Sequence, residues 1–155
     1  MERVGVGSYS DHLGVSIQDS TITSDGGAQR WAGASLRFGD ATSGDASVFR
    51  TTVSRFVGFG IEFRTPVGTP GPAARNVAVD DTVTDIHEAV TNPNDGTHEM
   101  GIWSAGEDAV IIGNTVTDSG WTAIQTIDHA NRVFIGDNTM SGQAFGGIWL
   151  ENGSA

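Results

Sequence analysis

Two neighbouring segments near the C-terminus repeat one another, and this repeat constrains the fold more than any other feature. Segments 108–130 and 131–153 each carry an Asn-Thr pair followed by an apolar residue and a Gly-containing turn. In each segment the tenth residue after the Asn is an Ile, Ile124 or Ile148, and a small residue precedes it. So short a unit cannot bury an apolar face alone, but similar units stacked on one another can. The repeat therefore predicts a solenoid.

Weaker copies of the unit occur earlier in the chain. The position of the repeated Asn is held in successive copies by Ser20, Thr51, Asp81, Asn114 and Asn138, at steps of 31, 30, 33 and 24 residues. The longer steps hold insertions at 24–32, 64–75 and 86–99. Asn and Asp tolerate the left-handed backbone of tight bends, and stacked side-chain amides bond to one another. This polar column is therefore expected where the chain bends between sheets.

Apolar residues alternate with polar ones on both sides of this column, which favours short strands over helices. The expected inward positions are Val15, Ile17, Ile22, Val48, Val53, Val79, Val83, Ile111, Val116, Val133, Ile135 and Met140, with a second ladder of Leu36, Ile61, Ile102, Ile124 and Ile148. The fold class is thus all-β, a parallel β-helix of about five coils over residues 14–155, and residues 1–13 form a lead-in or partial coil. A β-sandwich is the alternative fold, but it does not explain two columns that keep a ten-residue offset in three coils.

The segments resemble the parallel β-helix repeats of the pectin-lyase-like superfamily over about residues 14–152, most closely over 108–152. Members of that superfamily are right-handed solenoids found in polysaccharide lyases, hydrolases, epimerases and phage tailspikes. The resemblance implies a right-handed helix, a polysaccharide partner and an extracellular or cell-surface location. It carries over no catalytic residue, because Asp80-Asp81 lacks the His-Gly and Arg-x-Lys motifs that accompany paired Asp in polygalacturonases.

An aromatic face is expected beside the second ladder. Each inward Ile is followed by an outward residue, giving in chain order Arg37, Glu62, Trp103, Gln125 and Trp149, with Trp121 and Phe145 beside them over a floor of Gly and Ala. Flat aromatic faces stack on sugar rings, and acidic or amide neighbours bond to hydroxyls. The predicted carbohydrate-binding residues are Trp103, Trp121, Gln125, Phe145 and Trp149. The same face equally suits a subunit interface of a structural or adhesive solenoid without chemistry.

Catalysis on a polysaccharide would need two carboxyl groups about 5–9.5 Å apart. Glu62 and Glu99, on adjacent coils of one face, are the predicted pair, and an enzyme of this kind would be a hydrolase or a lyase. The four His show no spacing typical of a metal site, so none is predicted. Ca²⁺ bound by loop carboxylates such as Asp95 and Glu99 stays an open alternative.

The charge and the composition narrow the partners further. The net charge of −11 argues against nucleic acid and anionic membranes as partners. The chain has no Cys, no apolar run long enough to span a bilayer and no secretory signal. Because no segment looks like a cap, the solenoid ends are expected to be open. We therefore expect either a piece of a longer solenoid or self-association through the ends.

Overall fold

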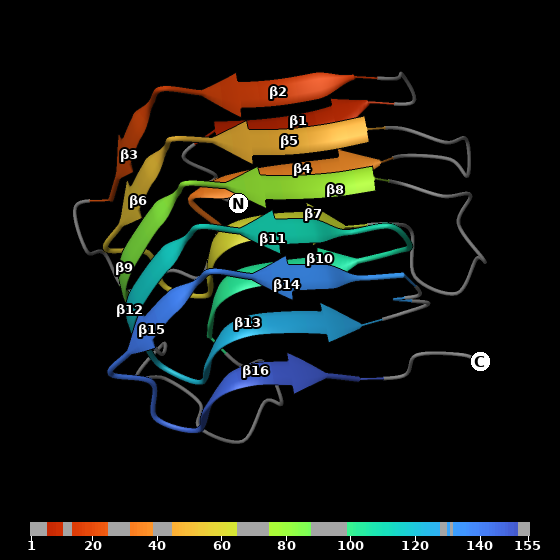
Figure 1. Cartoon of the computed structure of the whole chain (residues 1–155). Coiled ribbons are helices and arrows are strands. Elements are labelled where there is room, and N and C mark those ends of the chain that lie inside the picture. The colour runs from red at the N-terminus through yellow and green to blue at the C-terminus, as the bar shows by residue number, and fades with distance from the viewer. Residues whose placement is uncertain are drawn as a thin grey trace.

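The computed structural model describes residues 6–10, 14–24, 32–38, 45–64, 75–87, 99–127, 130 and 132–151. All regular elements in these ranges are strands, and they form three sheets (Figure 1). Sheet A contains β1 (Val6–Ser10), β4 (Ala34–Phe38), β7 (Phe59–Arg64), β10 (Met100–Ala105), β13 (Thr122–Ile127) and β16 (Gly146–Leu150). Sheet B contains β2 (Val15–Gln18), β5 (Asp45–Phe49), β8 (Arg75–Val79), β11 (Val110–Ile112) and β14 (Phe134–Gly136). Sheet C contains β3 (Thr21–Thr23), β6 (Thr52–Ser54), β9 (Thr82–Ile86), β12 (Thr115–Ser119) and β15 (Thr139–Ser141).

The chain visits sheets B, C and A in turn, and each strand pairs in parallel with the strand three elements later. The molecule is therefore a parallel β-helix of about five coils, as the repeat predicts, and it is right-handed, as the resemblance implies. In the described part of the chain, no helix is long and apolar enough to cross a membrane.

The core runs along the solenoid axis as ladders of apolar side chains. One ladder aligns Ile22, Val53, Val83, Val116 and Met140 across sheet C, and another aligns Ile61, Ile102, Ile124 and Ile148 across sheet A. Most of these side chains are wholly buried. Burying a branched aliphatic side chain contributes about 1.5–3 kcal/mol, so the stacking of coils supplies the stability that one coil lacks.

Two predicted ladder positions are wrong. Leu36 lies opposite Phe63 rather than Ile61, which faces Ala34, so the first coil is shifted by two residues. A shift of two keeps a side chain on the same face of a strand, and Leu36 is still buried. In sheet B the inward residue is Ala78, while Val79 is half-buried and belongs to the outward row.

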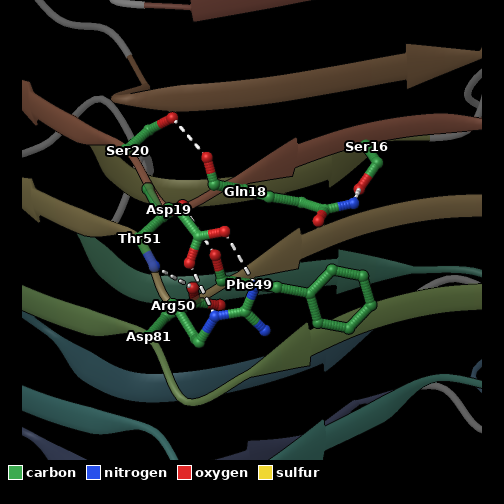
Figure 2. Close-up of polar contacts among 8 residues, drawn as sticks. All are labelled: Ser16, Gln18, Asp19, Ser20, Phe49, Arg50, Thr51 and Asp81. Atoms are coloured by element: carbon green, nitrogen blue, oxygen red, sulfur yellow. Dashed lines mark hydrogen bonds and ion pairs between the residues drawn. The ribbon is translucent and has the colours of Figure 1, made fainter.

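The predicted polar column is confirmed at the bend between sheets B and C. The backbone N–H of Thr51 donates to Oδ1 of Asp81 at 2.8 Å, as Figure 2 shows. The N–H of Asp81 donates to Oδ1 of Asn114 at 2.9 Å, and the N–H of Asn114 donates to Oδ1 of Asn138 at 2.9 Å. The side chains of Asp81, Asn114 and Asn138 therefore each accept a hydrogen bond from the backbone of the previous coil, whereas the hydroxyls of Ser20 and Thr51 donate to carbonyls of their own coil.

The left-handed backbone falls one residue earlier than expected. At this bend the residues with positive φ are Asp19, Arg50, Asp80, Gly113 and Asp137, with φ between 47° and 71°. The residue just before the column makes the turn, which leaves the column side chain free to point along the axis. Asp19 and Arg50 are the first two of these turn residues, and both are exposed. Arg50 donates two hydrogen bonds to Asp19 (2.6 and 2.8 Å; Figure 2).

Asp81 places a carboxyl where the next two coils have amides. Nδ2 of Asn114 donates to the carbonyl of Ala78 at 3.0 Å, and Nδ2 of Asn138 donates to the carbonyl of Ile111 at 2.9 Å. Oδ2 of Asp81 is buried and has no hydrogen-bond partner among the described residues. Burial raises the pKa of the Asp81 carboxyl to about 7. The column therefore contains one group that prefers to be protonated.

The last described coil leaves its inner face partly open. Ile148 and Leu150 of β16 are 46% and 68% exposed. Ile148 continues the ladder of Ile102 and Ile124, which are wholly buried. Self-association through the ends stays a prediction.

Candidate functional site

The site is a row of outward side chains, one from each of five neighbouring strands of sheet A. In register, the row consists of Ser35, Glu62, Trp103, Gln125 and Trp149. The structure therefore brings together Glu62, Trp103, Gln125 and Trp149 in the predicted order. Arg37 does not belong to this row, because it pairs with Arg64 and Ser35 lies beside Glu62.

A groove of about 420 Å³ lies over this row. Its aromatic lining consists of Phe59, Trp103, Trp121 and Trp149. Its polar lining consists of Glu62, Arg64, Gln125 and Glu151. The groove thus runs across β7, β10, β13 and β16. It combines flat apolar rings with a few polar groups.

The aromatic rings form two groups at opposite ends of the groove. Near β16, Trp121 stacks on Phe145 with centroids 4.3 Å apart and planes at 5°, and Trp149 lies 4.9 Å from Phe145. Near β7, Trp103 lies 5.6 Å from Phe59. Phe145, a predicted binding residue, is absent from the groove lining; it is 56% exposed and stacks on Trp121.

Glu62 is fixed by two neighbours although it lines the groove. Ser35 Oγ donates to Glu62 Oε2 at 2.5 Å, and Arg64 Nη1 donates to Glu62 Oε1 at 3.4 Å. The Arg64 guanidinium carbon also lies 6.0 Å from the centroid of Trp103, within range of a cation–π interaction. Glu62 itself is only 1% exposed.

Gln125 occupies the middle of the row, between the two aromatic groups. Its Nε2 donates to Oε2 of Glu151 at 2.9 Å, which orients the amide. Its Oε1 is buried and has no hydrogen-bond partner in the described part of the chain. A buried acceptor without a donor is costly, so this oxygen is a point where a bound hydroxyl would be stabilised.

The predicted carboxylate pair is not brought together in the groove. Glu99 immediately precedes β10, its side chain is 3% exposed, and it is not part of the groove lining. The other carboxylate of the groove, Glu151, follows β16, three strands along from the β7 strand that carries Glu62. Three strand spacings separate the two backbones by roughly 14 Å, and the Glu151 carboxylate reaches back to Gln125 of β13, where it accepts a hydrogen bond.

The expected floor of glycine on this face is not found. A Cβ on Gly60 would lie 2.3 Å from Cγ1 of Val83, and a Cβ on Gly101 would lie 2.2 Å from Cγ1 of Val116. These glycines therefore face the buried valines of sheet C, where any side chain would collide with the core. Three apolar lining residues were not predicted from the sequence: Met100, Ile127 and Phe59, the last of which follows the bend at Gly58 (φ 117°).

Arg64 and Glu151 were also missed, although a simple signal marks both. Each lies two residues after a predicted site residue, Glu62 and Trp149 respectively, and side chains two apart share a face of a strand.

The described residues bring no three His, Asp or Glu side chains together in a way that could hold a metal ion. Asp95 lies outside the described residues, so Ca²⁺ bound by Asp95 and Glu99 stays an open alternative.

Comparisons with family models, with curated proteins and with solved structures found no match to this chain.

Proposed function

We propose that this chain is a carbohydrate-binding β-helix module that holds an extracellular polysaccharide in the groove on sheet A. The observation that carries the proposal is the row itself. Trp103 and Trp149 lie on one row with the Gln125 amide between them, over a groove that is large enough for sugar rings. Aromatic faces combined with fixed amide and carboxylate groups are typical of carbohydrate recognition.

The geometry favours binding over hydrolysis. Glu62 is held by Ser35 and Arg64, and Glu151 is held by Gln125, so the carboxylates of the groove act as fixed acceptors for hydroxyl groups. Glu99, the expected second catalytic carboxylate, is outside the groove lining. Membership of the pectin-lyase-like superfamily and an extracellular location are part of this proposal, and both rest on the sequence resemblance.

The proposal is tested by comparing how tightly the parent protein, Trp103→Ala and Trp149→Ala bind to insoluble polysaccharides. Each substitution should weaken binding about tenfold, because an aromatic contact contributes about 1.5 kcal/mol. Phe134→Ala is the matched control, since Phe134 is an exposed aromatic residue on sheet B. Phe134→Ala should bind as the parent does.

Sedimentation velocity on the same variants separates this proposal from its rival. Lost polysaccharide binding with an unchanged sedimentation coefficient supports a glycan groove. An altered assembly state in Trp103→Ala, with no polysaccharide bound by the parent protein, would instead identify the face as a subunit interface.

A further inference from the structure

The spacing of the row sets the direction in which a glycan would lie. Neighbouring strands of a sheet are about 4.8 Å apart, and the row presents one side chain per strand from Glu62 to Trp149. This spacing is close to the length of one pyranose ring with its linkage in an extended chain. A glycan that follows the solenoid axis would therefore place about one ring over each of four strands.

The two tryptophans of the row restrict the linkage. Trp103 and Trp149 lie two strands apart, roughly 10 Å, with Gln125 between them. They would therefore stack on two rings that are separated by one other ring. In a chain with equatorial β-1,4 linkages, successive rings are turned by about half a turn, so alternate rings present the same face. Chains with axial linkages curve or wind, and alternate rings then point in different directions.

The charges of the groove restrict the sugar. Among the described residues, two carboxylates, Glu62 and Glu151, and one guanidinium, that of Arg64, line the groove, and Arg64 donates to Glu62. The whole chain carries a net charge of −11, which adds to the repulsion of any anionic polymer. The Oε1 of Gln125, which has no partner among the described residues, can accept a hydrogen bond from a sugar hydroxyl or an acetamido N–H.

We infer that the ligand is a neutral, extended β-1,4-linked glycan that lies along the solenoid axis with alternate rings on Trp103 and Trp149. This inference rests on the proposed function. It adds the linkage class, the charge class and the direction of the ligand.

Titration of tryptophan fluorescence with soluble oligosaccharides tests it. The probes are neutral β-1,4-linked oligomers of glucose, mannose and N-acetylglucosamine with two to six rings. Matched α-1,4-linked glucose oligomers and uronic acid oligomers serve as controls. For one or more neutral β-1,4 series, affinity should rise at least about tenfold from two to four rings and then level off, because the second tryptophan is reached only by the longer chain.

Trp149→Ala should remove this rise, so that four rings bind no better than two, while Trp149→Phe should keep part of it. Thermal unfolding of each variant checks that the fold is intact. The inference is overturned if uronic acid or α-linked oligomers bind as tightly as the β-1,4 series, or if two rings bind as tightly as four. Failure of every glycan to bind would overturn the proposed function itself, which makes the two failures distinguishable.

Discussion

The column at the bend between sheets B and C and the row on the outside of sheet A are built by the same stacking. In the column, successive coils carry Thr51, Asp81, Asn114 and Asn138, and each is bonded to the next. In the row, successive coils carry Glu62, Trp103, Gln125 and Trp149, which differ in size and charge. The varied side chains of the row face outward, and that is where a binding site can form.

The two regions differ in what completes their hydrogen bonds. The amides of Asn114 and Asn138 bond to neighbouring coils, and the buried Oδ2 of Asp81, which has no partner among the described residues, belongs to a residue outside the groove lining. The row leaves the Oε1 of Gln125 without a partner in the described structure and leaves aromatic faces along a groove. The column therefore serves stability, and substitutions in each region should separate stability from binding.

The largest effect is expected for Asp81→Asn at pH 8. The pKa of Asp81 is about 7 in the folded chain against 3.8 in a model peptide. Between these values the folded state holds a proton that the unfolded state has lost, so this group lowers stability as pH rises and has its full effect above pH 7. A difference of about three pKa units corresponds to about 4 kcal/mol. Asp81→Asn should therefore stabilise the protein by up to about 4 kcal/mol at pH 8.

Urea unfolding of both proteins from pH 4 to pH 8 measures this difference. At pH 4 the two should be nearly equal, because Asp81 is then protonated in the folded state. The charged neighbours Asp80 and Arg50 are present in both proteins, so subtracting the two profiles cancels their main contribution. A stability difference that does not change with pH would contradict the protonated carboxyl.

The next effect is that of Asn114→Ala, which opens the column. The substitution removes the acceptor of the Asp81 N–H and the donor to the Ala78 carbonyl, both in a buried bend. Leaving buried polar groups unpaired costs about 1–3 kcal/mol each, so a loss of about 3 kcal/mol is expected in urea unfolding. Asn138→Ala, in the half-buried last position, should cost about half as much. Equal costs at the two positions would mean that burial does not set the value of these bonds.

The smallest effect on stability is expected for Trp103→Ala. Trp103 is half-buried and its side chain contacts Phe59 and Arg64 at the surface of sheet A. The loss in free energy of unfolding should be about 1 kcal/mol, while polysaccharide binding falls about tenfold. A stability loss as large as that of Asn114→Ala would show that the row belongs to the packing of the fold.

The sequence was sufficient for the column and for most of the row because both lie in the regular part of the repeat. Asn114 and Asn138 are separated by the shortest step of the repeat. Trp103, Gln125 and Trp149 each follow an Ile of the second ladder and pair in the predicted register. The register of the first coil was not predicted correctly, because shifting the strand at Leu36 by two residues leaves the same side chains facing inward. The Ala78 position was missed because Val79 is the more apolar neighbour.

The remaining site residues depend on how the chain enters and leaves sheet A. Glu99 lies on the entering segment, where the alternation of β10 does not yet apply, and it is buried outside the groove lining. Phe59 follows a bend with a positive φ at Gly58, which periodicity cannot anticipate. Arg64 and Glu151 follow the alternation and could have been predicted.

Two-dimensional NMR of the side-chain N–H signals tests the central claim most directly, because it observes the row and the column in one experiment. During titration with a polysaccharide fragment that binds, the indole signals of Trp103 and Trp149 should shift together and saturate at one concentration. The side-chain amide signals of Asn114 and Asn138 should not move. Stationary indole signals during binding, or equal shifts in the Asn114 amide, would contradict an outer row that binds and an inner column that only stabilises.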